Sequence, residues 1–280
     1  MFAIALGLAA SATWGVADFI GGLQARRMPV VAVVLGSQLA GLALVGLAVA
    51  IRGEPPPSGD FAIYAALSSV GGIVGLTAFY RALSIGPMGV VAPLSSTAAA
   101  IPVIVGVATG DNPSKLQTLG LVVAVIGVAL ASREAEEEAR GSRRVSAGVG
   151  LALVSAVGFG CFFLLIDRAS DADVLWAVTV NRTVSVTLLG LALLAIRPAI
   201  GLRLANMGML AIAGSLDVGA NGLFALAATQ GLVSIVAVTA SLYPIMTVVL
   251  ARVVLKERLR AIQRVGAATA LLGVVLISAG

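Results

Sequence analysis

Charged residues are scarce in this chain of 280 residues, and this scarcity limits the class of protein to which it can belong. Asp, Glu, Lys and Arg make up 11% of the sequence, whereas about 25% is usual in a soluble domain. Hydrophobic residues make up 59%. Because so few charges cannot cover a surface that faces water, the composition excludes a soluble fold and predicts an outer surface that faces lipid.

Histidine is absent, and the single cysteine is Cys161. These two counts exclude a disulfide framework and a Cys/His metal site, and Cys161 is interpreted as a small buried hydrophobic residue. The sequence has no Walker loop and no dinucleotide-binding glycine motif. We therefore expect no cofactor, no metal, no ATP hydrolysis and no enzymatic activity. The net charge of +5 does not indicate nucleic-acid binding, because the cations lie in connections between apolar runs.

Apolar runs dominate what remains, and each is close to the roughly 20 residues that a helix needs to cross the hydrocarbon core. Lipid offers no partner to free backbone groups, so each run is expected to be an α-helix. The predicted fold is an all-α integral membrane protein with ten transmembrane helices. Their predicted bounds are 2–22, 30–51, 61–83, 89–109, 116–132, 146–166, 174–196, 207–229, 232–251 and 261–279.

The two halves of the sequence resemble one another at an offset of 145 or 146 residues. The segment 82–93 (ALSIGPMGVVAP) matches 227–238 (AATQGLVSIVAV), and the Gln-x-x-Gly that begins at Gln117 matches the one that begins at Gln263. Between the halves lies the most charged segment of the chain. We therefore predict a five-helix repeat at 1–132, a charged linker at 133–145 and a second five-helix repeat at 146–280.

An odd number of helices in each repeat makes the second repeat start on the opposite side of the membrane from the first. The repeats are therefore expected to be inverted, as in many secondary transporters. Fourteen Lys and Arg residues lie in the connections that follow odd-numbered spans, and three lie in the connections that follow even-numbered spans. The positive-inside rule places the first set in the cytoplasm and both termini outside.

Three parts of the sequence resemble the EamA-domain branch of the drug/metabolite transporter superfamily: Trp14-Gly15, the stretch 80–94 and the stretch 234–259. The last contains Ser-Leu-Tyr-Pro followed by Lys-Glu-Arg-Leu, although the family usually has glycine at Lys256. The resemblance covers nearly the whole chain. It implies ten helices in two inverted repeats and secondary transport, often export of amino acids, metabolites or toxic organic compounds. It does not name the substrate.

The few ionisable residues inside predicted spans are candidates for a solute or coupling site, because charges at membrane depth are costly. Asp18 lies four residues after Trp14, so an aromatic ring and a carboxylate share one helix face. This pair could bind an organic solute or carry a coupling proton. The alternatives are that Asp18 pairs with a basic group or faces lipid headgroups.

Asp217 and Asn221 form a second polar pair with the same spacing, in an otherwise apolar span, and are expected to face a cavity. Their equivalents in the first half are Gly72 and Leu76, so the pair breaks the repeat. Arg182 corresponds approximately to Gln38 in the first half. It could neutralise one of the two acids, or it could bind a substrate carboxylate through its planar guanidinium group.

Proline breaks in two matching spans predict a hinge and a cavity wall. The predicted residues in the first half are Pro93, Ser95, Ser96 and Thr97, and those in the second half are Ser241 and Pro244. The hydroxyl groups could instead cap the helix breaks locally. For Tyr243, a large side chain with a polar tip, contact with a solute is the favoured interpretation.

Together these features predict a multi-pass carrier in the cytoplasmic membrane that moves a small organic solute by alternating access. Protons are the candidate coupling ion, and the oligomeric state is left open between monomer and homodimer. A channel and a non-transporting membrane sensor are the alternatives. A channel would give flux without saturation, and a sensor would need an output domain.

Overall fold

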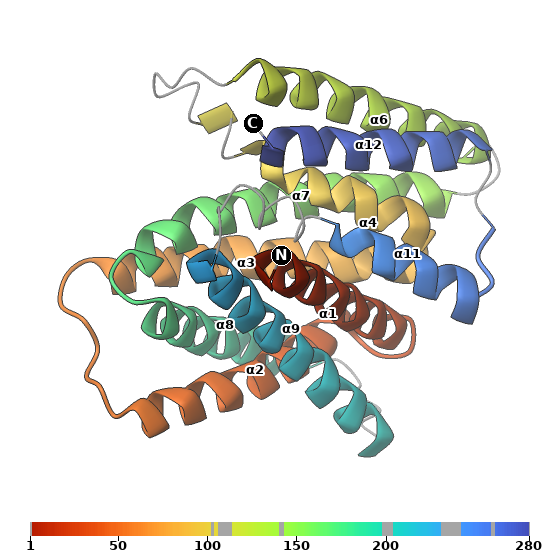
Figure 1. Ribbon diagram of the computed structural model, residues 1–280. Coiled ribbons are helices and arrows are strands. Elements are labelled where there is room, and N and C mark those ends of the chain that lie inside the picture. The colour runs from red at the N-terminus through yellow and green to blue at the C-terminus, as the bar shows by residue number, and fades with distance from the viewer. Residues whose placement is uncertain are drawn as a thin grey trace.

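The computed structural model describes residues 2–101, 104–105, 114–139, 143–197, 204–230, 242–258 and 261–279, and in these ranges every regular element is a helix (Figure 1). Six helices are long and apolar enough to cross a membrane, and shorter apolar helices lie at 115–127, 243–254 and 264–277. The number of ten spans stays a prediction. The α-helices are α1 (Phe2–Ala25), α2 (Val30–Arg52), α3 (Phe61–Ile85), α4 (Met88–Ser96), α6 (Lys115–Ala139), α7 (Arg143–Ser170), α8 (Val174–Ile196), α9 (Leu204–Gln230), α11 (Tyr243–Val254) and α12 (Ala261–Ala279), and the 3₁₀ helix η1 is Thr97–Ala99.

The helix bounds agree best with the predicted spans where the chain has clear capping signals. Helix α8 has the predicted bounds, and it begins after Asp173, whose carboxylate accepts a hydrogen bond from the Trp176 amide at 2.8 Å. Helix α2 ends just before Gly53, which has a left-handed φ of 67° and whose amide donates to the Val49 carbonyl. Several other helices are longer than their apolar runs, and α6 continues to Ala139 inside the predicted linker.

The predicted spans 4 and 9 are represented by shorter helices. Helix α4 contains Pro93 in its interior and passes into η1 after Ser96, so the fourth span changes its helical geometry within three residues of the proline. Helix α11 begins at Tyr243 and has Pro244 in its first turn. The backbone N–H that proline lacks would have no partner within the helix at this position. Residues 231–241 lie outside the described residues.

The two halves pack in a pattern that the repeat explains. At the observed offset, α1, α2, α3, α4 and α6 correspond to α7, α8, α9, the span that contains α11, and α12. Helix α1 packs on α9 and α3 packs on α7, which are the same contact with the halves exchanged. In the same way, the contact of α2 with α9 corresponds to the contact of α8 with α3. The contact of α4 with α7 corresponds to the contact of α11 with α1. Such an exchange indicates an approximate twofold relation between the halves.

Two further crossings join equivalent helices directly. Helices α6 and α12 lie side by side along one edge of the molecule, and α2 and α8 pack together toward the opposite edge (Figure 1). Small residues permit the first crossing, because a Cβ on Gly127 would lie 2.3 Å from the Ala270 nitrogen and a Cβ on Gly273 would lie 2.4 Å from the Ala124 nitrogen. These two contacts are equivalents of one another at an offset of 146 residues.

Large aliphatic side chains cover much of the outer surface. Leu191, Leu194 and Val125 are all more than half exposed, although a water-facing surface would carry charges at such positions. This surface accounts for the low charge content of the sequence. Cys161 on α7 is also exposed, so its interpretation as a buried residue is wrong. Composition cannot separate burial in protein from exposure to lipid, because both environments favour apolar residues.

Candidate functional site

Arg182 is at the centre of a polar cluster inside the apolar bundle. Its Nη1 donates to Oε1 of Gln38 on α2, and its Nη2 donates to Oδ2 of Asp217 on α9. Arg182 is only 9% exposed, whereas the side chain of Asp217 is 33% exposed. The guanidinium group thus ties three helices from both halves together, and the carboxylate is the more accessible partner.

Small residues allow these helices to approach closely enough for the cluster to form. A Cβ on Gly214 of α9 would lie 2.0 Å from the Ser37 carbonyl oxygen of α2. A Cβ on Gly41 of α2 would lie 2.8 Å from a methyl group of Val218. Because these glycines flank Gln38 and Asp217 by three residues or fewer, the close backbone approach positions both partners of Arg182.

Gln38 and Arg182 are 144 residues apart and lie on the equivalent helices α2 and α8. Residues that contact their own equivalents lie on the axis that relates the halves. Two arginines at this point would repel one another, whereas a glutamine carbonyl accepts the arginine's hydrogen bond. The two halves therefore differ at the axis that relates them, at the positions of Gln38 and Arg182, which the sequence repeat pairs approximately with one another.

A second buried hydrogen bond attaches α8 to α3. The Asn181 amide donates to the Ser68 hydroxyl of α3 at 2.8 Å, and that hydroxyl donates in turn to the Ala65 carbonyl. Ser68 was missed by the sequence analysis because serines are frequent in apolar helices and carry no distinguishing pattern. This contact orients Asn181, the neighbour of Arg182, and so restricts rotation of α8.

An aromatic pair lies on α1 and α9, the helices that carry Asp18 and Asp217. The rings of Trp14 and Phe224 are 6.0 Å apart and inclined at 43°. Asn221 donates to the Asp217 backbone carbonyl at 2.7 Å, so part of its polarity is satisfied within α9. Phe224 was missed, although it lies three residues after Asn221 and seven after Asp217, which places all three on one helix face.

Asp18 is half-buried in α1 and forms no ion pair with a described residue. The charges of Asp18 and Asp217 act on one another, and both act on Tyr80, while Asp18 also acts on Tyr243. Tyr80 can lie against α1 because a Cβ on Gly21 would be 2.2 Å from its ring. Of the two predicted acids, only Asp217 is paired with Arg182, and Asp18 has no basic partner among the described residues.

The predicted hinge residues mostly form local contacts. Ser96 donates to the Pro93 carbonyl at 2.8 Å and Thr97 donates to the Leu94 carbonyl at 2.7 Å, so both hydroxyls bond the turn that precedes them. Ser95 donates to the Ala152 carbonyl of α7 at 3.5 Å. Ser241 lies outside the described residues. These contacts match the alternative in which the hydroxyl groups stabilise the helix break.

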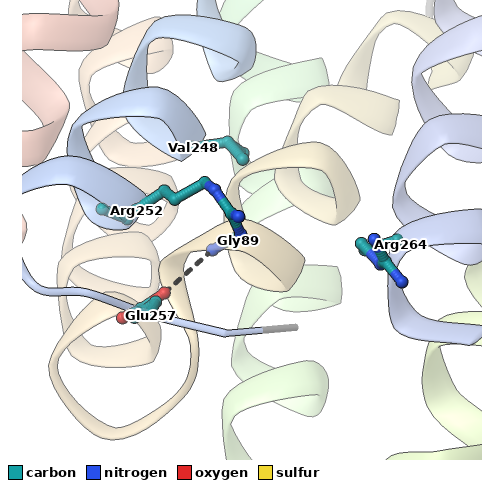
Figure 2. Close-up of a pocket in the computed structure, with 6 residues that line it drawn as sticks. Gly89, Val248, Arg252, Glu257 and Arg264 are labelled. Atoms are coloured by element: carbon teal, nitrogen blue, oxygen red, sulfur yellow. Dashed lines mark hydrogen bonds between the residues drawn. The ribbon is translucent and has the colours of Figure 1, made fainter. Parts of the chain in front are cut away.

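One charged contact joins the halves at the end of the bundle where α4 begins. Glu257, which follows α11, accepts a bond from Arg26 at 3.0 Å and another from the Gly89 amide in the first turn of α4 at 3.4 Å (Figure 2). Arg26 also donates to the Leu83 and Gly86 carbonyls at the end of α3. Glu257 belongs to the Lys-Glu-Arg-Leu motif, and its carboxylate favours a helix N-terminus.

A different charged contact joins the halves where α2 ends and α8 begins. Arg52 forms ion pairs with Asp173 at 2.9 Å and with Glu54 at 3.1 Å, and the Trp176 indole donates a hydrogen bond to the Glu54 carbonyl. Partial burial opposes ionisation of Asp173, but the Trp176 amide and the Arg52 guanidinium outweigh it and lower the pKa of Asp173. The carboxylate is therefore charged at neutral pH in its two roles, as a helix cap and as an ion-pair partner.

An all-helical bundle with an aliphatic surface and a polar centre defines a multi-pass membrane protein. The chain matches the EamA-like transporter family over residues 1–133 and again over residues 146–279. It therefore belongs to the EamA-like transporter family and contains two copies of the family's repeat.

Solved structures agree with this fold. Fourteen chains match, and one of them, described as "Crystal structure of protein", has a TM-score of 0.63. That match covers 98% of this chain and 96% of the other at 15% identity, so it supports the fold alone. No curated protein matches the chain.

Proposed function

We propose that this protein is a secondary transporter that moves small organic solutes across the cytoplasmic membrane by alternating access, without ATP. The observation that carries the proposal is the polar cluster of Gln38, Arg182 and Asp217, which draws on both halves inside an apolar bundle. Polar groups at membrane depth are costly and characteristic of solute or ion pathways. Amino acids, related metabolites and toxic organic compounds are the proposed substrates, and export is the proposed direction.

We further propose ten spans arranged as two inverted repeats, 1–132 and 146–280, joined by the charged segment 133–145. The contact of α1 with α9 is repeated by the contact of α7 with α3. This repetition supports the arrangement, because it relates the halves by an approximate twofold axis. An axis in the membrane plane would pass through the contact between Gln38 and Arg182. Rocking of one half against the other about this point would open the cluster to each side in turn.

The cluster offers different chemistry to different parts of a solute. Trp14 and Phe224 provide an aromatic wall, and Asp18 provides an unpaired carboxylate for an amine or a proton. The Nε–H of Arg182 is buried and has no acceptor among the described residues, so the guanidinium group retains a donor for a substrate carboxylate. A zwitterionic amino acid would satisfy both charged groups.

Counterflow in proteoliposomes tests the transport proposal. Vesicles that contain the purified protein are loaded with one candidate metabolite at a time, and exchange with labelled external solute is followed. We expect saturable, self-competed uptake for at least one amino acid or related metabolite, and loss of that uptake on Arg182→Gln. Flux that rises linearly with concentration would indicate a channel and would contradict the proposal.

Proton coupling is tested separately with a pH gradient across the same vesicles. If Asp18 or Asp217 carries the coupling proton, then either Asp18→Asn or Asp217→Asn abolishes the response of uptake to the gradient, while counterflow without a gradient continues. An unchanged response in both variants would contradict coupling through these residues and leave facilitated export as the mechanism.

A further inference from the structure

An apolar groove with a basic mouth runs between α4 of the first half and α11 and α12 of the second. The basic mouth of the groove is a pocket of about 110 Å³ lined by Gly89, Val248, Ala251, Arg252, Glu257 and Arg264. It shares Gly89, Val248 and Arg264 with an adjoining pocket of about 200 Å³, so the two form one continuous groove. The proposed transport cluster contributes no residue to it.

Two arginines at the mouth are exposed and unpaired. Neither Arg252 on α11 nor Arg264 on α12 forms a hydrogen bond or ion pair with a described residue. The one carboxylate at the mouth, Glu257, is already bonded to Arg26 and to the Gly89 amide. Figure 2 shows the side chain of Arg252 extending toward Gly89, with Arg264 on the facing helix. Within the part of the chain that the structure describes, the mouth therefore carries two positive charges without a counter-charge.

The groove becomes apolar away from this mouth along both helices. On α11 the lining proceeds from Arg252 through Val249 to Ile245, and on α12 it proceeds from Arg264 through Ala268 to Leu271. Seven residues of helix correspond to a length of about 10 Å. Val249 is 47% exposed and Ile245 is 46% exposed, so the apolar part opens to the outer surface that faces lipid.

We propose that this groove binds an anionic phospholipid, with the phosphate between Arg252 and Arg264 and part of one acyl chain along α11 and α12. A charged end followed by an apolar channel that opens to the bilayer matches the chemistry of such a lipid, and basic pockets between membrane helices bind anionic headgroups. A bound lipid would contact α4 of one half and α11 and α12 of the other. It would thereby hold together two parts that alternating access moves relative to one another.

Native mass spectrometry of the purified full chain tests this site with phosphatidylglycerol and phosphatidylcholine that have identical acyl chains. We expect a preference for phosphatidylglycerol that falls about thirtyfold in R252Q/R264Q, because each arginine near an anionic headgroup contributes a factor of about five. The matched control R81Q/R197Q removes the same charge from exposed positions outside the groove and should keep the preference.

Two further arms distinguish a seated lipid from adsorbed phosphate. Ala268→Phe fills the groove while both arginines remain, and it should lower phosphatidylglycerol binding; Val249→Phe serves the same purpose if the first variant does not fold. Inorganic phosphate at the same concentration should not displace the lipid. The proposal is overturned if wild type shows no preference, if the control loses as much binding as R252Q/R264Q, if the filled groove binds equally well, or if inorganic phosphate competes.

Discussion

Equivalent helices pack on one another at several places in the described residues, and two of these crossings, α6 with α12 and α2 with α8, treat the repeat differently. At α6 and α12, Gly127 against Ala270 and Gly273 against Ala124 are equivalents of one another, so each half makes the same contact. At α2 and α8, Gln38 meets Arg182, and only one half carries the charge. Both crossings join the same two halves of one molecule.

The comparison separates what packing requires from what a polar site requires. Close packing of small residues is satisfied equally by both halves, so nothing favours a difference between them. A cluster on the axis cannot be symmetric if it contains arginine, since a second guanidinium would lie against the first. Asymmetry in a repeat protein thus marks the positions where chemistry, and not packing, determines the residue.

The largest effect should come from removing the asymmetric charge. Arg182→Gln makes the second half like the first but leaves the Asp217 carboxylate without its partner, and we expect a loss of about 2 kcal/mol in stability because Asp217 is partly exposed. Transport should fall by at least about thirtyfold. Thermal unfolding and counterflow measure the two effects.

The double variant R182Q/D217N sharpens this test. It removes both charges, so stability should largely return while transport stays lost. Arg197→Gln, an exposed position at the end of the same helix, is the control and should change neither quantity. Wild-type transport in R182Q would show that the asymmetry at α2 and α8 has no functional role.

A smaller effect is expected from breaking the symmetric crossing. Gly127→Ala and Gly273→Ala each push a Cβ into the backbone of the facing helix, which should cost about 2 kcal/mol. Because the two contacts are equivalents, the two losses should agree to within about 0.5 kcal/mol. Thermal unfolding in detergent is the measurement.

Gly46→Ala and Gly190→Ala are matched controls for this pair, because nothing lies within 4 Å of a Cβ at either position. They should leave stability unchanged or raise it slightly, since alanine favours helix more than glycine does. Strongly unequal losses at Gly127 and Gly273 would contradict the symmetric packing.

The smallest effect concerns the contact between α2 and α8 at their ends, which also breaks the repeat. At the offset of 144 residues that pairs Gln38 with Arg182, the equivalents of Arg52 and Asp173 are Ile196 and Pro29, so the ion pair occurs once. Asp173→Ala removes the helix cap and the ion pair and should cost about 1 kcal/mol. Asp173→Asn keeps a good cap, so its cost should be smaller.

The pH dependence of the same contact has a definite sign. The pKa of Asp173 is lowered in the folded protein, so its contribution is present above the ordinary aspartate pKa of about 4 and is lost as the pH falls below that value. Wild type should therefore lose more stability than D173A as the pH falls from 5 towards 3, by at most about the 1 kcal/mol above. Equal losses in the two proteins would exclude this role of Asp173.

Much of the fold could be predicted from the sequence because it depends on apolar runs and on a repeat. The bounds of α8 and α12 coincide with the predicted spans, since capping or charged residues stand beside them. Helix α1 runs three residues and helix α3 two residues beyond the predicted span, because a helix continues where its backbone bonds are available even after the apolar run ends. A proline break was predicted in the fourth span, but the change to η1 after Ser96, where the chain packs against α7, was not.

The candidate site was predicted in part. Asp18, Gln38, Arg182 and Asp217 could be identified from the sequence because few polar residues interrupt the predicted spans. Which acid pairs with Arg182 depends on how α2, α8 and α9 approach one another, and this distance is set by Gly41 and Gly214. Tyr80 and Phe224 were missed because an aromatic residue in an apolar helix has no distinguishing signal until its neighbours on other helices are known.

The carboxylate of Glu257 connects more helices than any other carboxylate described above. It holds Arg26, which in turn holds the end of α3, and it also bonds the first turn of α4, while the residue itself belongs to the second half. A movement that carries the segment after α11 away from α3 and α4 therefore has to break both the ion pair with Arg26 and the bond from the Gly89 amide.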